Sequence, residues 1–152
     1  MVKPNKPLVI LMAEDDHDYY LLTKDAIEKL AMGIDLRYVE DGEELMQYLL
    51  RQAKYEDPES SPRPDIIFLD LNMPRKNGIE ALREIKSNHA LRQIPVIILT
   101  ISQDAMDVSM CYRLGANSFI TKPLGFEQLL DVIKVLSSYW FKTVLLPSPP
   151  NH

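Results

Sequence analysis

Three runs of apolar residues along the chain are each about as long as one strand. They are Leu8–Ala13, Ile66–Leu69 and Ile94–Leu99. Because such a run has no polar face, it predicts a strand covered on both sides, as in a parallel sheet. Two shorter segments, Leu36–Val39 and Asn117–Thr121, predict two further strands, and the first is polar enough to lie near a sheet edge.

Apolar residues at three- and four-residue spacing follow the strands and predict helices between them. These stripes are Leu22-Ala26-Ile27-Leu30, Leu45-Met46-Leu49-Leu50, Ile79-Leu82-Ile85 and Met106-Met110-Cys111-Leu114. We expect Asp16 to cap the first helix, Gly33 to end it, and the last helix to run from about Gly125 to Trp140. Five alternations of strand and helix predict an α/β fold with a doubly wound five-stranded parallel sheet, in strand order 2-1-3-4-5.

The length of 152 residues fits one domain with a core spanning about 7–140. The segment 55–64 contains no aliphatic residue and predicts a solvent-exposed loop inserted between a helix and the central strand. The segment 141–152 continues past the last helix as a C-terminal extension, in which three prolines follow a short apolar stretch.

Charge and cysteine content restrict the functional classes. The net charge of −5 and the absence of a basic run argue against a nucleic-acid partner. The single cysteine, Cys111, excludes an internal disulfide and favours a reducing compartment. No stretch reaches the roughly 20 apolar residues of a membrane span, and Leu8–Ala13 is too short for a signal peptide. We therefore expect a cytoplasmic protein with no membrane partner.

Four of the predicted strands end in residues that carry chemistry. They end at Glu14 and Asp15, at Asp70, at Thr100 and at Lys122. Because the carboxyl ends of parallel strands meet at one edge, we expect these side chains to share a crevice. Clustered carboxylates need a compensating cation, and oxygen ligands suit Mg²⁺. Phosphoryl transfer needs a nucleophile and groups that neutralise charge. Asp70 would be the carboxylate nucleophile, assisted by a lysine, a hydroxyl and Mg²⁺.

The same residues resemble the response-regulator receiver domain from Leu8 to about Tyr139. The acid pair follows the first strand, Asp70 begins the motif Asp-Leu-Asn-Met-Pro, and Gly78 lies eight residues after Asp70. Thr100 lies 30 residues after Asp70, and a Lys-Pro pair begins 52 residues after it, at Lys122. The resemblance implies a flavodoxin-like receiver fold and a single-domain response regulator of a two-component phosphorelay.

The resemblance also assigns the phosphoryl acceptor and the ligands of the metal ion. The resemblance implies that Asp70 accepts a phosphoryl group from the phosphohistidine of a sensor histidine kinase. It implies that Asp15 and Asp70 bind Mg²⁺ through their side chains and Asn72 through its main-chain carbonyl. Glu14 would act mainly through a metal-bound water.

The resemblance also implies a switch. Lys122 would pair with the acceptor or the phosphoryl oxygens, Thr100 would hydrogen-bond the phosphoryl group, and Phe119 would move inward with Thr100. The family often has Tyr at position 119, so Phe119 lacks a hydroxyl. Ile101 is bulkier than the small residue usual after the threonine, and we expect it to slow phosphorylation by small donors.

The end of the chain suggests partners. Val132, Val135 and Tyr139 form a second apolar stripe on the last helix, which together with the extension predicts a homodimer. The Ser-Tyr-Trp-Phe ending at Phe141 and the Asn-Ser-Phe-Ile-Thr-Lys-Pro segment ending at Pro123 are similar to stand-alone cyanobacterial phytochrome response regulators. That similarity implies a phytochrome-type histidine kinase as partner, with the signal passed on through the last helices.

Two alternatives compete with the phosphoacceptor interpretation. A phosphatase of the haloacid-dehalogenase type also uses a strand-end aspartate, but it needs a second acid where this chain has Asn72. A degenerate receiver would act as a phosphorylation-independent binding module, and its mark would be the loss of Asp15, Asp70 or Lys122. All three are present, so we expect a protein that catalyses only its own phosphorylation and hydrolysis rather than an enzyme.

Overall fold

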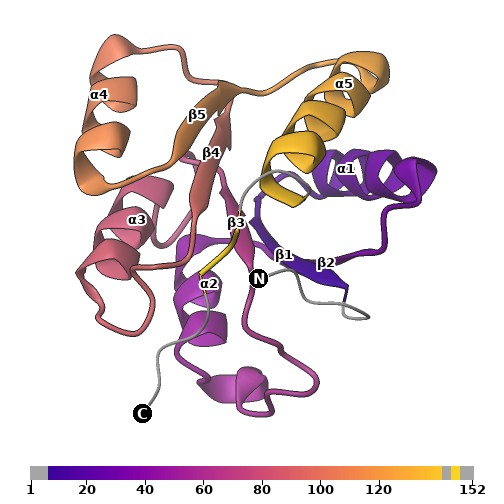
Figure 1. The fold of residues 1–152 in the computed structure, drawn as a ribbon. Helices are drawn as coiled ribbons and strands as arrows, with labels where there is room; N and C mark the ends of the chain where they lie inside the picture. Colours follow the sequence, from indigo (N-terminus) through magenta and orange to yellow (C-terminus); the bar gives the residue numbers. More distant parts are fainter. Residues whose placement is uncertain (1–6, 142–144, 148–152) are drawn as a thin grey trace.

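The computed structural model describes residues 7–141 and 145–147 and contains one five-stranded parallel sheet. The strands are β1 (Leu8–Ala13), β2 (Ile34–Val39), β3 (Ile66–Leu69), β4 (Val96–Thr100) and β5 (Ser118–Thr121). Their order in the sheet is β2-β1-β3-β4-β5 (Figure 1), so the predicted fold class and strand order are confirmed.

Helices cover both faces of this sheet (Figure 1). They are α1 (His17–Leu30), α2 (Gly42–Leu49), the 3₁₀-helix η1 (Ala53–Tyr55), α3 (Gly78–Ser87), α4 (Ala105–Leu114) and α5 (Phe126–Leu136). The last helix continues as a π-helical turn, η2 (Ser137–Phe141). Helices α1 and α5 pack on one face, and α2, α3 and α4 pack on the other.

The inner strands are buried on both faces because their side chains alternate between two cores. In β1, Ile10 and Met12 join the core under α1 and α5, whereas Leu11 and Ala13 join the core under α2, α3 and α4. Strands β3 and β4 alternate in the same way, which explains why the three runs in the sequence are continuously apolar. The carboxyl ends of these strands are thereby fixed from both sides.

The first helix ends earlier than the sequence suggested. Asp16 caps it as predicted, but the helix stops at Leu30, and the prediction that Gly33 ends it was wrong. Ala31 takes the left-handed conformation, with φ of 49°, and donates its N–H to the Glu28 carbonyl. The chain turns here because β2 begins at Ile34, two residues before the predicted strand.

The inserted loop is exposed only in part. Residues 56–60 include the exposed tip, but Ser61 and Pro64 are buried. The Tyr48 hydroxyl donates a hydrogen bond to the Pro62 carbonyl at 2.8 Å, which holds this end of the loop against α2. Of the predicted C-terminal extension, residues 142–144 and 148–152 lie outside the described residues, and Leu146 packs against the core under α1 and α5.

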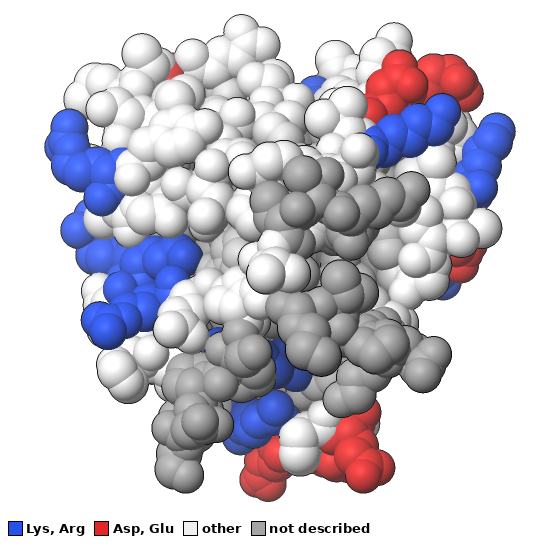
Figure 2. All heavy atoms as spheres, in the orientation of Figure 1, with Lys and Arg blue, Asp and Glu red and all other residues white. Residues whose placement is uncertain are grey.

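Charged side chains do not form one continuous field on the face drawn in Figure 2. Basic residues gather at the left edge, over α3 and α4, and acidic residues gather at the upper right and at the bottom. Within residues 7–141 and 145–147, no helix combines the length and the apolar character needed to cross a membrane.

Candidate functional site

The ends of β1 and β3 place two acidic residues next to each other. These strands are parallel neighbours, with Ala13 opposite Leu69, so the residues that follow them emerge together. The Asp70 N–H donates to the Ala13 carbonyl at 3.1 Å, and the Glu14 N–H donates to the Val39 carbonyl of β2 at 3.1 Å. Glu14 is 1% exposed and Asp70 is 4% exposed. The sheet itself therefore holds two carboxylates in a buried position.

A third carboxylate completes an acidic cluster at this edge. Glu14, Asp15 and Asp70 each offer an oxygen atom, and these atoms lie within 4.8 Å of one another. Asp15 is exposed, so the cluster opens to solvent on its side. Three carboxylate oxygens at this spacing fit a hard divalent cation such as Mg²⁺ or Mn²⁺. The structure thus brings together the predicted side-chain ligands.

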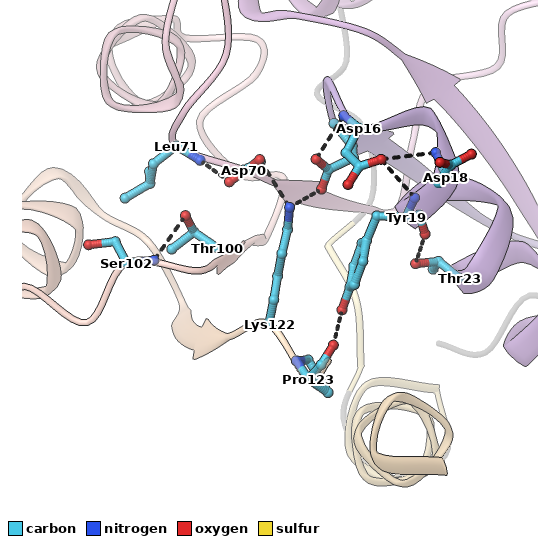
Figure 3. Close-up of polar contacts among 11 residues, drawn as sticks. Asp16, Asp18, Tyr19, Thr23, Asp70, Leu71, Thr100, Ser102, Lys122 and Pro123 are labelled. Carbon is cyan, nitrogen blue, oxygen red and sulfur yellow. Dashed lines mark hydrogen bonds and ion pairs between the residues drawn. The ribbon is translucent and has the colours of Figure 1, made fainter. Parts of the chain in front are cut away.

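Lys122 extends from the end of β5 into the same cluster (Figure 3). Its Nζ lies 2.8 Å from Glu14 Oε1 and 3.2 Å from Asp70 Oδ2. Burial alone would lower the pKa of Lys122, but its contacts with Glu14 and Asp70 outweigh burial and raise the pKa above its ordinary value. Lys122 therefore stays protonated between the two buried acids.

The pKa of Glu14 is raised well above its ordinary value. Burial raises its pKa from 4.5 to about 8, with repulsion from Asp70 adding to the rise. The contact with Lys122 and the hydrogen bond donated by the Asp16 N–H act in the opposite direction. Any further positive charge brought into the cluster would stabilise the ionised form of this carboxyl group.

Asp70 is held on both oxygens. Oδ1 accepts the Leu71 N–H at 2.8 Å, and Oδ2 faces Lys122. The loop that follows returns to Asp70 at Gly78, where a Cβ atom would lie only 2.1 Å from the Asp70 carbonyl oxygen. A side chain at position 78 would push this loop away, so glycine is required. Asn72 lies in the same loop and is exposed.

The predicted switch residues lie on the other flank, along β4 and β5. Thr100 is buried at the end of β4, and its Oγ1 accepts the Ser102 N–H at a long 3.5 Å. Phe119 is half-buried against the core under α2, α3 and α4, and its N–H donates to the Tyr112 hydroxyl at 3.0 Å. Ile101 is 63% exposed.

The sequence analysis missed Asp41 as a support of the site. Asp41 is 1% exposed, caps α2 by accepting the Glu44 N–H at 2.8 Å, and accepts the Arg75 Nε–H at 2.8 Å. The Gly42 N–H also donates to the Lys76 carbonyl at 3.0 Å. These contacts tie the loop after Asp70 to the start of α2. The sequence does carry a signal for Asp41, because an aspartate three residues before a glutamate is a capping pattern.

Tyr19 is a second residue that the sequence analysis missed. Its hydroxyl donates to the Pro123 carbonyl at 2.9 Å, and the Lys122 Nζ lies 4.7 Å from the centroid of its ring. The signal was available in the apolar stripe of the first helix. Extending that stripe one or two turns back from Ala26 leads through Thr23 to Tyr19, which the structure buries on the same face.

Comparison with known proteins identifies a family for this arrangement. The family model described as "Response regulator receiver domain" matches residues 10–134. The response regulator Rcp1 of a Synechocystis species is 38% identical over 144 residues, which cover 95% of this chain and 96% of Rcp1.

Solved structures show the same similarity. The phosphorylated cyanobacterial phytochrome response regulator RcpA matches with a TM-score of 0.86 and 36% identity, over 93% of this chain and 99% of that one. The Mn²⁺-bound form of Rcp1 matches with a TM-score of 0.84 and 38% identity, over 93% of this chain and 100% of that one. These similarities extend over nearly the whole length of both partners, and the matched residues include the acidic cluster and Lys122.

Proposed function

The chain belongs to the response regulator receiver domain family, and from this membership we propose that it accepts a phosphoryl group on Asp70 as a single-domain response regulator. The observation that carries the proposal is the position of Lys122. Its ammonium lies between Glu14 and Asp70 within an acidic cluster that fits a divalent cation. Charge neutralisation and positioning are what phosphoryl transfer mainly needs.

In the proposed reaction, an oxygen of the Asp70 carboxylate forms a bond to phosphorus while the phosphorus–nitrogen bond of a phosphohistidine breaks. The imidazole nitrogen leaves with the electron pair of that bond. Asp70 is suited to this role because the hydrogen bond from the Leu71 N–H fixes the direction of its carboxylate. Hydrolysis of the aspartyl phosphate returns the protein to its starting state, so the protein turns over no outside substrate.

Lys122 and Thr100 act on the transferred group in this proposal. The ammonium of Lys122 is close enough to Asp70 to pair with a phosphoryl oxygen after a small movement. Thr100 is buried at the neighbouring strand end, and its long hydrogen bond to Ser102 is weak enough to exchange for a bond to the phosphoryl group. Phe119 would then follow Thr100 inward and pass the change to the last helices.

The proposed metal is Mg²⁺. Asp15 and Asp70 would bind it through their side chains, Asn72 through its main-chain carbonyl, and Glu14 through a bound water. When bound, the ion neutralises charge on the phosphoryl oxygens. The clustered oxygens of Glu14, Asp15 and Asp70 support this assignment, and the related Rcp1 has an Mn²⁺-bound form.

The proposed phosphodonor is a sensor histidine kinase of the phytochrome type, because related proteins of similar length include a phytochrome response regulator. Phosphotransfer from such a kinase would take place in the cytoplasm. A nucleic-acid partner is not part of the proposal, since the net charge is −5 and the sequence contains no basic run.

We also propose a homodimer formed through the last helix and the C-terminal extension. Val135 on α5 is 68% exposed, Tyr139 on η2 is 53% exposed, and Leu145 is 70% exposed. Val132 is partly buried against the core, so it offers less to a partner than the sequence suggested. Sedimentation at tens of micromolar tests this proposal: Val135→Asp should give a monomer, and a monomeric wild type would contradict the dimer.

Phosphotransfer tests the proposed function. A phosphorylated phytochrome-type histidine kinase, freed of ATP, is mixed with the protein in the presence of Mg²⁺. We expect the label to move to the wild type and to Asp65→Asn, a control acid at the opposite end of β3, but not to Asp70→Asn. Folded protein that takes no label from any such kinase or from a small phosphodonor would favour the binding-module alternative.

A further inference from the structure

Tyr19 is a buried tyrosine that none of the proposed steps uses. Tyr19 is 9% exposed, and the Lys122 Nζ lies 4.7 Å from the centroid of its ring. Its hydroxyl donates to the Pro123 carbonyl at 2.9 Å. Figure 3 shows the Tyr19 and Lys122 side chains running side by side, with the tyrosine hydroxyl directed at the turn after the lysine. One side chain therefore contacts both the charged end of Lys122 and the backbone that follows it.

Tyr19 is itself held on its backbone and on its ring. The Asp16 carboxylate accepts the Tyr19 N–H at 3.3 Å as part of the helix cap. The Thr23 hydroxyl, which is buried, donates to the Tyr19 carbonyl at 2.9 Å. The ring belongs to the core under α1 and α5, together with Met12 and Phe68 of the sheet. The ring is thus a rigid wall between this core and the acidic cluster.

The ring of Tyr19 limits the positions open to the Lys122 ammonium, whose own side chain is flexible. A lysine stem has four rotatable carbon–carbon bonds, and a compact ammonium can pair with either acid. Glu14 at 2.8 Å competes with Asp70 at 3.2 Å for the same group. The face of an aromatic ring attracts an ammonium and limits where it can go. The hydrogen bond to Pro123 restrains the other end of the lysine, where the strand stops.

From these contacts we propose that Tyr19 is a positioning residue for phosphoryl uptake, which keeps the ammonium of Lys122 in reach of Asp70. The role rests on the proposed function, since it acts through Lys122 on the phosphoryl group. The ring confines the ammonium, and the hydroxyl fixes the turn at Pro123. Tyr20, the next residue, faces elsewhere and stacks on Tyr38 with ring centroids 4.0 Å apart.

Two substitutions separate the contributions of hydroxyl and ring. Uptake from acetyl phosphate with Mg²⁺ is followed by intact mass. Tyr19→Phe keeps the ring and loses one hydrogen bond, so the rate should fall about fivefold. Tyr19→Leu loses both contacts, so the rate should fall about 20-fold. The matched controls Tyr20→Phe and Tyr20→Leu should keep the wild-type rate. Unchanged rates in both Tyr19 variants would overturn the positioning role.

A double substitution shows whether Tyr19 acts through Lys122. In a Lys122→Met background, Tyr19→Leu should cause no further loss of rate, because the group that it positions is gone. A further loss of about 20-fold in that background would mean that Tyr19 acts by another route, such as general loosening of the core. Near-UV circular dichroism checks that each variant folds. If Tyr19→Leu does not fold, the rate of Tyr19→Phe in the two backgrounds tests the positioning role.

A spectroscopic measurement tests the position of Lys122 without phosphorylation. The ring current of Tyr19 should shift the side-chain NMR signals of Lys122 in the wild type and in Tyr19→Phe, and the shift should disappear in Tyr19→Leu. A shift that persists in Tyr19→Leu would overturn the inference. Absence of phosphoryl uptake by the wild type contradicts the proposed function, whereas uptake at an equal rate in the Tyr19 variants overturns the inference alone.

Discussion

The two flanks of the site are built differently. On the flank formed by β1, β3 and α1, Glu14 and Asp70 are buried, and Lys122 contacts both of them. On the flank formed by β4 and α4, Ile101 is 63% exposed and Met106 is 79% exposed, and the Thr100 hydroxyl accepts the Ser102 N–H at a long 3.5 Å. We therefore call the first the fixed flank and the second the adjustable flank. In the proposed function, the fixed flank carries the chemistry and the adjustable flank passes the change on.

The largest effect should come from removing the charge of the fixed flank. Lys122→Met leaves Glu14 and Asp70 without their shared cation, and it removes the partner of the phosphoryl oxygens. We expect phosphoryl uptake from acetyl phosphate to fall by about 100-fold or more, measured by intact mass against time. Lys122→Arg keeps the charge and should retain part of the rate. Wild-type uptake by Lys122→Met would contradict the assigned role of the lysine.

Two aspartate helix caps provide a matched pair: Asp41 binds the loop that follows Asp70, and Asp104 begins α4 on the adjustable flank. Asp41 and Asp104 each cap a helix, but Asp41 is buried and also binds Arg75, whereas Asp104 caps α4 at an exposed position. We expect Asp41→Ala to lower the free energy of unfolding by about 2 kcal/mol and Asp104→Ala by about 0.5 kcal/mol. Urea denaturation measures both. Equal losses would mean that burial and the contact with Arg75 add nothing to the cap made by Asp41.

The raised pKa of Glu14 makes the stability of the metal-free protein depend on pH. The pKa of this carboxyl rises from 4.5 to about 8 on folding, so the folded state binds the proton more tightly than the unfolded state. The resulting stabilisation is complete below about pH 4.5 and is lost as the pH rises towards about 8. The free energy of unfolding in urea should therefore fall across this range. Glu14→Gln should flatten the slope, and an unchanged slope would exclude Glu14 as its source.

The smallest effect concerns Ile101 on the adjustable flank. Its side chain is exposed, so Ile101→Ala should change the free energy of unfolding by no more than about 0.5 kcal/mol. Truncation opens the approach to Thr100 and Asp70, and uptake from acetyl phosphate should become a few times faster than in the wild type. The exposed Met106→Ala is the control and should leave the rate unchanged. A rate for Ile101→Ala at or below that of the wild type would show that this side chain does not limit access.

The sequence predicted the fold because each inner strand carries apolar residues on both faces. It predicted which acids meet because β1 and β3 end in them, and the parallel order brings those ends together. It missed the contacts of Tyr19 with Pro123 and of Asp41 with Arg75, because these partners lie 104 and 34 residues apart in the chain. No periodic pattern encodes such contacts. It placed the end of α1 at Gly33 because glycine is the usual C-terminal signal, whereas β2 starts early enough to force the turn at Ala31.

The central claim is that Asp70 is the acceptor in a preformed, metal-assisted site. Intact mass after incubation with acetyl phosphate, with and without Mg²⁺, tests it most directly. We predict a gain of one phosphoryl group that requires Mg²⁺, appears in the wild type and is absent in Asp70→Asn. A gain that persists in Asp70→Asn, or that is independent of Mg²⁺, would contradict the account.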